Sequence, residues 1–305
     1  MKLSSLALAT AVLVGAAPDA YSQVALVKRI VPAEGQALVV WEKRAPRARG
    51  TILLVHGRTW SGLPAFDLQV PGERHSVMDA LVARGYSAYA VDLRGYGSTP
   101  RDPSGWNTPD RSAEDVAAVL AWIATTSSTS LRPALLGWSN GATLAILCAQ
   151  HHPDRMSTLI LTGLWKHPDS LIVSGLDPGS PERRPNTAAA AASDFIAPGV
   201  MSEKAIGVFV AAALAADPVR ADWRQLDEWN AIDPAKVVTP TLLIQGEFDP
   251  LAPTATQAAF FSRLGTGDRE WVVLAGGDHA ALIENTQPAF VAAVVNFLER
   301  PIWHP

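Results

Sequence analysis

The sequence predicts an α/β protein: a mostly parallel, doubly wound sheet with an inserted helical cap. Short apolar runs of the kind that form strands buried on both faces alternate with stretches of helical periodicity. This alternation stops at residue 163 and resumes near residue 236. Alternating strands and helices are typical of a parallel sheet with helices on both faces, and the interruption indicates an insertion.

Length and composition narrow the classes of protein. The chain has 305 residues, 48% of them hydrophobic, and a net charge of −4. This is enough apolar material for a large core, either as one domain with an insertion or as two small domains. The nearly balanced charge offers no basic surface, so we expect no nucleic-acid partner. The single cysteine, Cys148, lies in an apolar helical run and is expected to be a buried small hydrophobe.

The N-terminus has the pattern of a signal peptide at residues 1–22. Lys2 supplies a positive charge, residues 3–17 are uncharged and mostly apolar, and Ala20 and Ser22 are small residues before a cleavage site. The apolar stretch is short for a hydrocarbon core of about 30 Å, so we expect no stable membrane span after leader removal. The protein is therefore expected to be exported, to the periplasm or the medium. An uncleaved anchor or a disordered tail is the alternative.

The elements of the core are expected in two parts, residues 24–162 and 236–305. The expected strands cover residues 24–31, 36–43, 51–55, 87–91, 133–136, 158–161, 241–244 and 271–274. The expected helices cover residues 77–83, 113–124, 141–151, 254–264 and 288–299. Between these parts, residues 163–235 are too long for an ordinary connection. Helical patterns at 203–216 and 220–229 predict a packed cap over one end of the sheet rather than a disordered insertion.

The strongest chemical signal is the Gly-Trp-Ser-Asn-Gly motif at 137–141, which matches G-x-S-x-G. A buried strand leads into it and a helix leads out, so Ser139 is expected on a sharp turn with its hydroxyl exposed at the edge of the sheet. A free serine hydroxyl is a weak nucleophile and needs a base within hydrogen-bond reach.

His279 is the expected base among the seven histidines. It follows the last predicted strand in a glycine-containing loop, at the same sheet edge as Ser139 if the strands are parallel. Asp249 follows the strand 241–244 and is the expected acid that orients the imidazole, with Glu247 as the fallback. The chain order Ser139, Asp249, His279 is the order that this architecture requires.

The oxyanion site is expected where residue 57, a glycine, follows an early strand. The backbone N–H groups of Arg58 and Asn140 are the expected donors. The Arg58 side chain either binds a substrate carboxylate, pairs with a local acid or faces solvent.

Three tryptophans also follow strand ends: Trp60, Trp138 and Trp165. They are expected either to crowd one site for an apolar or aromatic substrate group, or to pack the turn at Ser139 and the cap.

With these motifs in place, the chain resembles the α/β-hydrolase superfamily, in particular its capped serine hydrolases, which are esterase- or lipase-like, with a His-Gly oxyanion motif. The resemblance covers nearly everything after the leader, including Asp-Leu-Arg-Gly-Tyr-Gly-Ser at 92–98, which is similar to the family's D-x-R-G-x-G-x-S loop. It implies a triad of Ser139, Asp249 and His279 with oxyanion amides at Arg58 and Asn140. Epoxide hydrolases and haloalkane dehalogenases of the superfamily have an aspartate where this chain has Ser139.

The expected reaction is hydrolysis of a carboxylic ester or lactone of a small molecule through an acyl-enzyme on Ser139. The same triad also suits an exopeptidase or amidase, a thioesterase or a perhydrolase, and a non-catalytic binding protein is the remaining alternative. An exopeptidase would need a cap carboxylate to meet a substrate amine; the candidates are Glu203, Asp222, Asp227 and Glu228. No metal or cofactor is implied, and the oligomeric state is not determined by the sequence.

Overall fold

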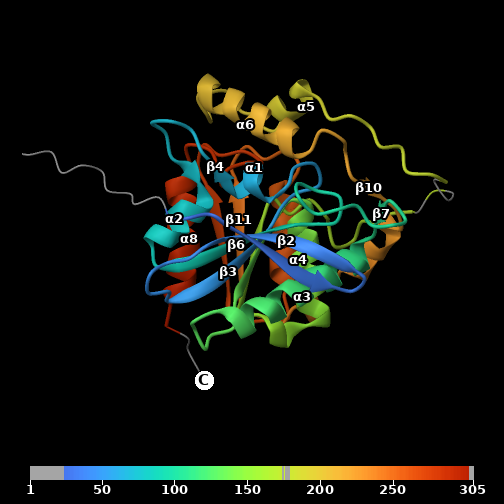
Figure 1. Ribbon diagram of the computed structural model, residues 1–305. Coiled ribbons are helices and arrows are strands. Elements are labelled where there is room, and N and C mark those ends of the chain that lie inside the picture. The colour runs from blue at the N-terminus through green and yellow to red at the C-terminus, as the bar shows by residue number, and fades with distance from the viewer. Residues whose placement is uncertain (1–23, 174, 176–178, 302–305) are drawn as a thin grey trace, which may run out of the picture.

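The computed structural model describes residues 24–173, 175 and 179–301, and Figure 1 shows their arrangement. The signal peptide expected at residues 1–22 lies outside the described residues. Among the residues that are described, no helix combines the length and apolar character that crossing a membrane requires.

The core is one eight-stranded sheet in the order β1-β2-β6-β3-β8-β9-β11-β12. β2 pairs antiparallel with β1 and with β6, and every other neighbouring pair is parallel. The predicted mostly parallel α/β fold is therefore confirmed. The strands are β1 (Val27–Ala33), β2 (Gln36–Lys43), β3 (Gly50–Val55), β6 (Tyr86–Asp92), β8 (Ala134–Trp138), β9 (Thr158–Thr162), β11 (Thr241–Gly246) and β12 (Arg269–Leu274).

Helices cover both faces of this sheet (Figure 1). One face packs against α3 (Pro109–Thr126), α4 (Asn140–His151) and α7 (Thr254–Arg263). The other packs against α2 (Val77–Ala83) and α8 (Gln287–Glu299). Residues of β3, β8 and β9 are buried, since helices cover them from both sides, which is why these strands read as continuous apolar runs.

The described residues of the segment 163–235 add no strand to the eight-stranded sheet. They form two α-helices, α5 (Ala188–Ala192) and α6 (Glu203–Ala216), which lie together above one edge of the sheet, next to the short helix α1 (Gly62–Phe66) (Figure 1). α6 begins where the Ser202 hydroxyl accepts a hydrogen bond from the Ala205 N–H at 3.0 Å. We call residues 163–235 the insertion.

The second helical pattern expected in the insertion, at 220–229, is wrong. This stretch forms the short strand β10 (Asp222–Trp223), parallel to β7 (Trp106–Asn107), and then a 3₁₀ helix, η2 (Leu226–Ala231). Gln225 has φ 55° and ψ 40°, a left-handed conformation that no α-helix passes through. The rings of Trp223 and Trp229 stack at a centroid distance of 6.3 Å.

Four short elements complete the description. β4 (Asp67–Leu68) and β5 (His75–Ser76) pair antiparallel beside α1, and η1 (Pro153–Arg155) and η3 (Pro234–Lys236) are single 3₁₀ turns before β9 and β11. Such elements have too few residues to produce a periodic pattern, so the sequence carried no signal for them.

Candidate active site

Ser139 sits on a strained turn between β8 and α4. Its backbone has φ 57° and ψ −117°, outside the regions that L residues normally occupy. The two glycines of the motif permit this turn, because a Cβ on Gly137 would lie 2.2 Å from the Gly141 carbonyl oxygen. A Cβ on Gly141 would lie 2.1 Å from the Val55 carbonyl oxygen. Any larger residue at either position would push the turn apart.

The turn leaves Ser139 accessible while its neighbours are buried. Trp138 is 3% exposed and Asn140 is 2% exposed, whereas Ser139 is partly exposed. The Ser139 N–H donates to the Thr162 carbonyl oxygen, at the end of β9, at 2.9 Å. The hydroxyl thus stands at the carboxyl ends of the central parallel strands, where ligands bind in folds of this type.

His279 and Asp249 meet at the same edge. The Nδ1 atom of His279 lies 2.9 Å from the Oδ2 atom of Asp249, in the loops after β12 and β11. The other carboxylate oxygen of Asp249 accepts from the N–H groups of Leu251 at 2.9 Å and Ala252 at 3.1 Å. The Asp249 side chain is fully buried and held on both oxygens, so it orients the imidazole through Nδ1.

Contacts with Trp138 and Gly163 place the imidazole beside the turn that carries Ser139. The Trp138 indole N–H donates to the His279 carbonyl oxygen at 2.8 Å, and the two rings have centroids 5.8 Å apart. A Cβ on Gly163, the residue after β9, would lie 2.9 Å from the His279 Cε1 atom. Within the described chain no hydrogen bond joins the Ser139 hydroxyl to the imidazole; in ligand-free sites such bonds are often long until substrate binds.

The two predicted oxyanion donors are both available. Among the described residues, nothing accepts a hydrogen bond from the backbone N–H of Arg58 or of Asn140. Asn140 is the first residue of α4, so its N–H has no partner inside the helix. Arg58 follows Gly57, whose Cβ position lies 3.4 Å from the Ser139 Cβ atom. Both N–H groups thus belong to residues next to the serine.

A tyrosine of the 92–98 loop holds the Arg58 peptide. The Tyr96 hydroxyl donates to the Arg58 carbonyl oxygen and accepts from the Trp223 indole N–H at 2.8 Å. His56 supports the same loops, since its Nε2 atom accepts from the Leu93 N–H at 3.2 Å. Burial lowers the pKa of His56 to about 4, so this imidazole is neutral and serves as a structural acceptor.

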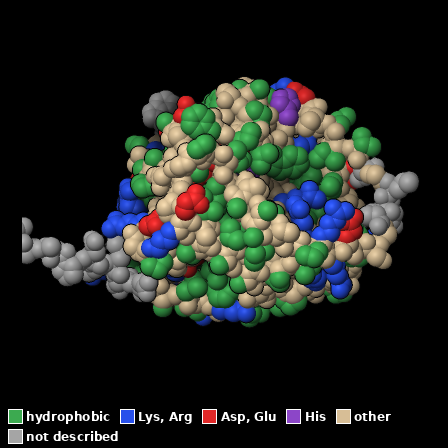
Figure 2. All heavy atoms as spheres, turned by 90° about the horizontal axis from the view of Figure 1, so that it is seen from above, with side chains coloured by type: hydrophobic (Ala, Val, Ile, Leu, Met, Phe, Trp, Pro, Cys, Tyr) green, Lys and Arg blue, Asp and Glu red, His purple; other side chains and the backbone are tan. Residues whose placement is uncertain are grey.

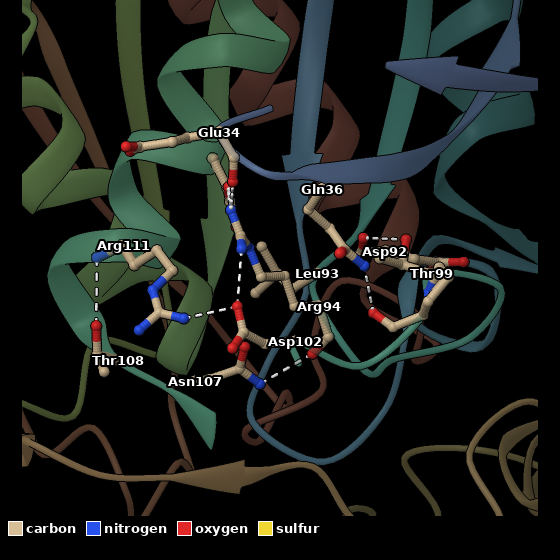
Figure 3. Close-up of polar contacts among 12 residues, drawn as sticks. Glu34, Gln36, Asp92, Leu93, Arg94, Thr99, Asp102, Asn107, Thr108 and Arg111 are labelled. Atoms are coloured by element: carbon tan, nitrogen blue, oxygen red, sulfur yellow. Dashed lines mark hydrogen bonds and ion pairs between the residues drawn. The ribbon is translucent and has the colours of Figure 1, made fainter. Parts of the chain in front are cut away.

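Asp92 and Arg94 of this loop bind neighbouring segments, and Figure 3 shows the contact of Arg94 with Asp102. Asp92 accepts from the backbone N–H groups of Gly62 at 2.9 Å and Ser98 at 3.0 Å. Arg94 pairs with Asp102 at 2.9 Å and with Asp115 at 2.7 Å. Residues 92–98 therefore bind this loop to the core and hold Tyr96 in contact with the Arg58 carbonyl oxygen.

Two acids of the insertion lie next to the site, and neither was predicted. Asp217 accepts from the N–H groups of Ser61 and Gly97, each at 2.8 Å, and so ties the end of α6 to the loops after β3 and β6. Asp194 accepts from the Trp60 indole N–H at 2.7 Å. Burial raises the pKa of Asp194 to about 6, although that hydrogen bond and the neighbouring His279 act to lower it.

Of the four insertion acids expected for an exopeptidase, two are engaged elsewhere. Asp222 pairs with Arg101 at 3.7 Å, and Glu228 accepts from the Asp110 N–H at 2.8 Å. The insertion acid that lies near the imidazole is Asp194 instead. The sequence offers little indication that Asp194 belongs to the site, because this residue follows an alanine run and no predicted strand ends nearby.

The three tryptophans have different partners. Trp60 is 2% exposed and packs its ring edge-on to Phe209 of α6, at 6.3 Å between centroids. Trp138 packs against His279, and Trp165, which is partly buried, packs edge-on to Trp229 at 6.3 Å. Each ring thus contacts the turn or the insertion; a role in binding substrate remains a prediction.

Comparison with known proteins identifies the family. Residues 46–286 match the family described as serine aminopeptidase, S33. The chain belongs to this family of α/β-hydrolases. Its predicted superfamily is thereby confirmed.

Two curated relatives of this S33 family member are named as esterases or hydrolases. It is 27% identical to a pimeloyl-[acyl-carrier protein] methyl ester esterase of Aeromonas hydrophila subsp. hydrophila over 73% of this chain and 89% of that protein. It is also 34% identical to a pyrethroid hydrolase of Sphingobium wenxiniae, over 43% of this chain and 42% of that protein.

Solved structures share the fold. An esterase from Thermogutta terrifontis superposes with a TM-score of 0.62 and 21% identity, over 90% of this chain and 98% of that one. An epoxide hydrolase from Vigna radiata superposes with a TM-score of 0.63 and 18% identity, over 90% and 98%. At such identities the likeness shows the fold alone, and the fold hosts more than one chemistry.

Proposed function

We propose that this S33 family member is a serine hydrolase that cleaves a carboxylic ester or lactone of a small molecule through an acyl-enzyme on Ser139. The observation that carries the proposal is the 2.9 Å hydrogen bond between His279 Nδ1 and Asp249 Oδ2 at the sheet edge that also bears Ser139. A buried carboxylate that orients an imidazole beside an accessible serine on a strained turn is the arrangement that nucleophilic catalysis requires.

The chemistry follows from the positions of these groups. His279 Nε2 takes the proton of the Ser139 hydroxyl while Oγ attacks the carbonyl carbon of the ester. The N–H groups of Arg58 and Asn140 stabilise the oxyanion of the tetrahedral intermediate. The imidazolium, steadied by Asp249, then gives its proton to the departing alkoxide, and an acyl-enzyme remains. A water molecule, deprotonated by His279, then attacks the acyl-enzyme in the same way; Ser139 regains its proton and the carboxylic acid is released.

The relatives support an ester as the scissile bond, because one is named a methyl ester esterase and another a pyrethroid hydrolase. A second candidate is release of an N-terminal residue from a peptide. It is supported by the family's description and by Asp194, an acid of the insertion near the imidazole. Asp194 already accepts from the Trp60 indole N–H, which makes it a weaker anchor for a substrate amine than an unengaged carboxylate.

The insertion is proposed to act as a cap over the site, and the leader at residues 1–22 to direct export. Asp217 and Asp194 fasten the insertion to the loops after β3 and β6 around the site. The mature chain would then act outside the cytoplasm on a substrate small enough to enter beneath α5 and α6.

The test uses the purified mature chain with 4-nitrophenyl butyrate and alanine 4-nitroanilide, together with a fluorophosphonate that labels activated serines. We expect turnover of the ester, little turnover of the anilide, and a covalent adduct on Ser139. Ser139→Ala should abolish both turnover and labelling. Full activity in Ser139→Ala would refute the triad, and turnover of the anilide alone would establish the aminopeptidase.

A further inference from the structure

Two arginines beside the site, Arg58 and Arg220, have no acidic partner. Across residues 24–173, 175 and 179–301, no carboxylate oxygen lies within 4.0 Å of either guanidinium. Other arginines nearby are paired, since Arg101 lies 3.7 Å from Asp222 and Arg184 contacts Glu182. Both Arg58 and Arg220 are exposed to solvent.

One tyrosine links the two loops that carry these arginines. The Tyr96 hydroxyl donates to the Arg58 carbonyl oxygen and accepts from the indole of Trp223, three residues after Arg220. The Arg220 backbone is fixed on both sides: its N–H donates to the Arg184 carbonyl at 2.8 Å, and its carbonyl accepts from Arg101 at 3.0 Å. The backbone at both positions is therefore fixed, while the two guanidinium groups keep their donors free.

Neither arginine forms a direct ion pair with a described carboxylate, although both sense neighbouring charges. The pKa of Arg58 is lowered, first because surrounding atoms displace water and also because Arg220 adds a like charge. Arg220 also acts on the carboxyl of Asp194, as His279 does, so its charge reaches the neighbourhood of the imidazole. On the face of the molecule that carries α5 and α6, basic and hydrophobic side chains border a hollow (Figure 2).

We propose that Arg58 and Arg220 form an anion subsite at the mouth of the active site, and that the substrate is an ester that also carries a carboxylate, such as a monoester of a dicarboxylic acid. The proposal rests on the proposed function for the hydrolytic step. Two neighbouring like charges without a paired carboxylate are unfavourable, and a bound carboxylate would offset that repulsion. The planar guanidinium matches the two oxygens of a carboxylate, which gives orientation as well as attraction.

The same subsite discriminates against a substrate amine. A protonated amine at the mouth would meet two positive charges, while the two insertion acids beside the site are already engaged: Asp194 accepts from the Trp60 indole, and Asp217 accepts from the Ser61 and Gly97 N–H groups. The arginines thus favour the esterase over the aminopeptidase on electrostatic grounds.

The test compares two esters that differ only in charge: 4-nitrophenyl hydrogen glutarate and its methyl ester. We expect the wild type to prefer the anionic ester, and Arg220→Gln and Arg58→Gln each to lower the anionic-to-neutral ratio of kcat/KM by about tenfold or more. Arg184→Gln removes an exposed, paired arginine of the same segment and should leave the ratio within about twofold of wild type. An unchanged ratio in both Arg58→Gln and Arg220→Gln, or a wild-type preference for the neutral ester, would overturn the subsite.

Binding separates this inference from the proposed function. Calorimetric titration of glutarate into Ser139→Ala needs no turnover, and we expect binding that weakens about tenfold when Arg220→Gln is added. Binding of glutarate without any ester turnover or serine labelling would leave the subsite standing and refute the hydrolase. Labelling and turnover without charge preference and without glutarate binding would refute the subsite alone.

Discussion

Asp278, the residue before His279, binds the backbone of Ile196 in the insertion. Its Oδ2 atom accepts from the Ile196 N–H at 2.6 Å and from the Ala197 N–H at 2.7 Å, while Oδ1 accepts from Ala280 at 3.1 Å. A buried carboxylate that receives several N–H groups is a strong and rigid contact. The position of the insertion and the position of the imidazole are therefore linked through one side chain.

Asp278→Asn should loosen that link. The amide group offers an NH₂ toward backbone N–H groups, and loss of charge-assisted hydrogen bonds costs about 1.5–3 kcal/mol each. We expect faster amide hydrogen exchange at Ile196 and Ala197, a higher KM and a lower Tm. Asp268→Asn, which breaks an outer ion pair with Arg300, is the control and should leave exchange at these two amides as it is in the wild type. Unaltered exchange in Asp278→Asn would contradict the linkage.

Glu284 should make the stability of the protein fall as pH rises. Its Oε2 atom accepts from the Asp278 N–H at 3.0 Å, and burial together with the neighbouring Asp278 raises its pKa to about 9. The unfolded chain has the ordinary value of 4.5 for this group, so between these values the folded state holds a proton that the unfolded state releases. The stabilising contribution is complete below the unfolded value and is lost as pH rises through the folded one.

Urea unfolding of wild type and Glu284→Gln across this pH window checks the sign. A glutamine side chain at this position cannot ionise, so the variant should lack the part of the downward slope that Glu284 causes, and the difference should be greatest in alkaline solution. Parallel stability curves for the two proteins would show that Glu284 is ionised in the fold.

Asp249→Asn should lower kcat by about four powers of ten with little change in fold, because an amide that donates to Nδ1 stabilises the wrong tautomer of His279. Glu247→Gln is the matched control. Glu247 is exposed, and its Oε2 atom accepts from the Gly276 N–H at 2.9 Å, a bond that glutamine retains. In steady-state kinetics, kcat should fall only in Asp249→Asn and stay near the wild-type value in Glu247→Gln. An equal fall of kcat in Glu247→Gln would mean that Glu247 is the acid that orients the imidazole.

Gly163→Ala should displace the imidazole. Gly163 has φ 62°, and an added Cβ would lie 2.9 Å from His279 Cε1 and 3.3 Å from Trp138 Cδ1. We expect kcat to fall by at least about tenfold with a smaller change in KM, since a small misplacement of a reacting group has large effects on rate. Gly207→Ala, where a Cβ in α6 meets nothing within 4 Å, should retain activity and gain about 0.5–1 kcal/mol of stability.

Ser139→Gly and Ser139→Ala should both be inactive yet differ in stability. The φ of 57° at this position is unfavourable for alanine and acceptable for glycine. Ser139→Gly should therefore be more stable than Ser139→Ala by about 1 kcal/mol, measured by chemical unfolding. Equal stabilities would mean that the turn relaxes when the hydroxyl is removed.

The sequence alone predicted every strand of the large sheet, with each end within three residues of its place in the structure. Strands buried on both faces must be apolar along their whole length, and β3, β8 and β9 carried this signal plainly. The motif 137–141 located Ser139, because only glycine fits where neighbouring backbones approach within 2.2 Å of a missing Cβ. Such local constraints, and the order of Ser139, Asp249 and His279, can be recognised from the amino-acid sequence.

Tertiary structure alone decided how the insertion folds after α6 and how it attaches to the core. The pattern at 220–229 was helical by spacing, yet pairing with β7 and the left-handed Gln225 gave a strand and a 3₁₀ turn. Asp194, Asp217 and Asp278 could not be distinguished from surface acids, because their partners lie 134, 156 and 82 residues away along the chain. Burial and hydrogen bonding depend on which segments meet in space, and no local pattern records that.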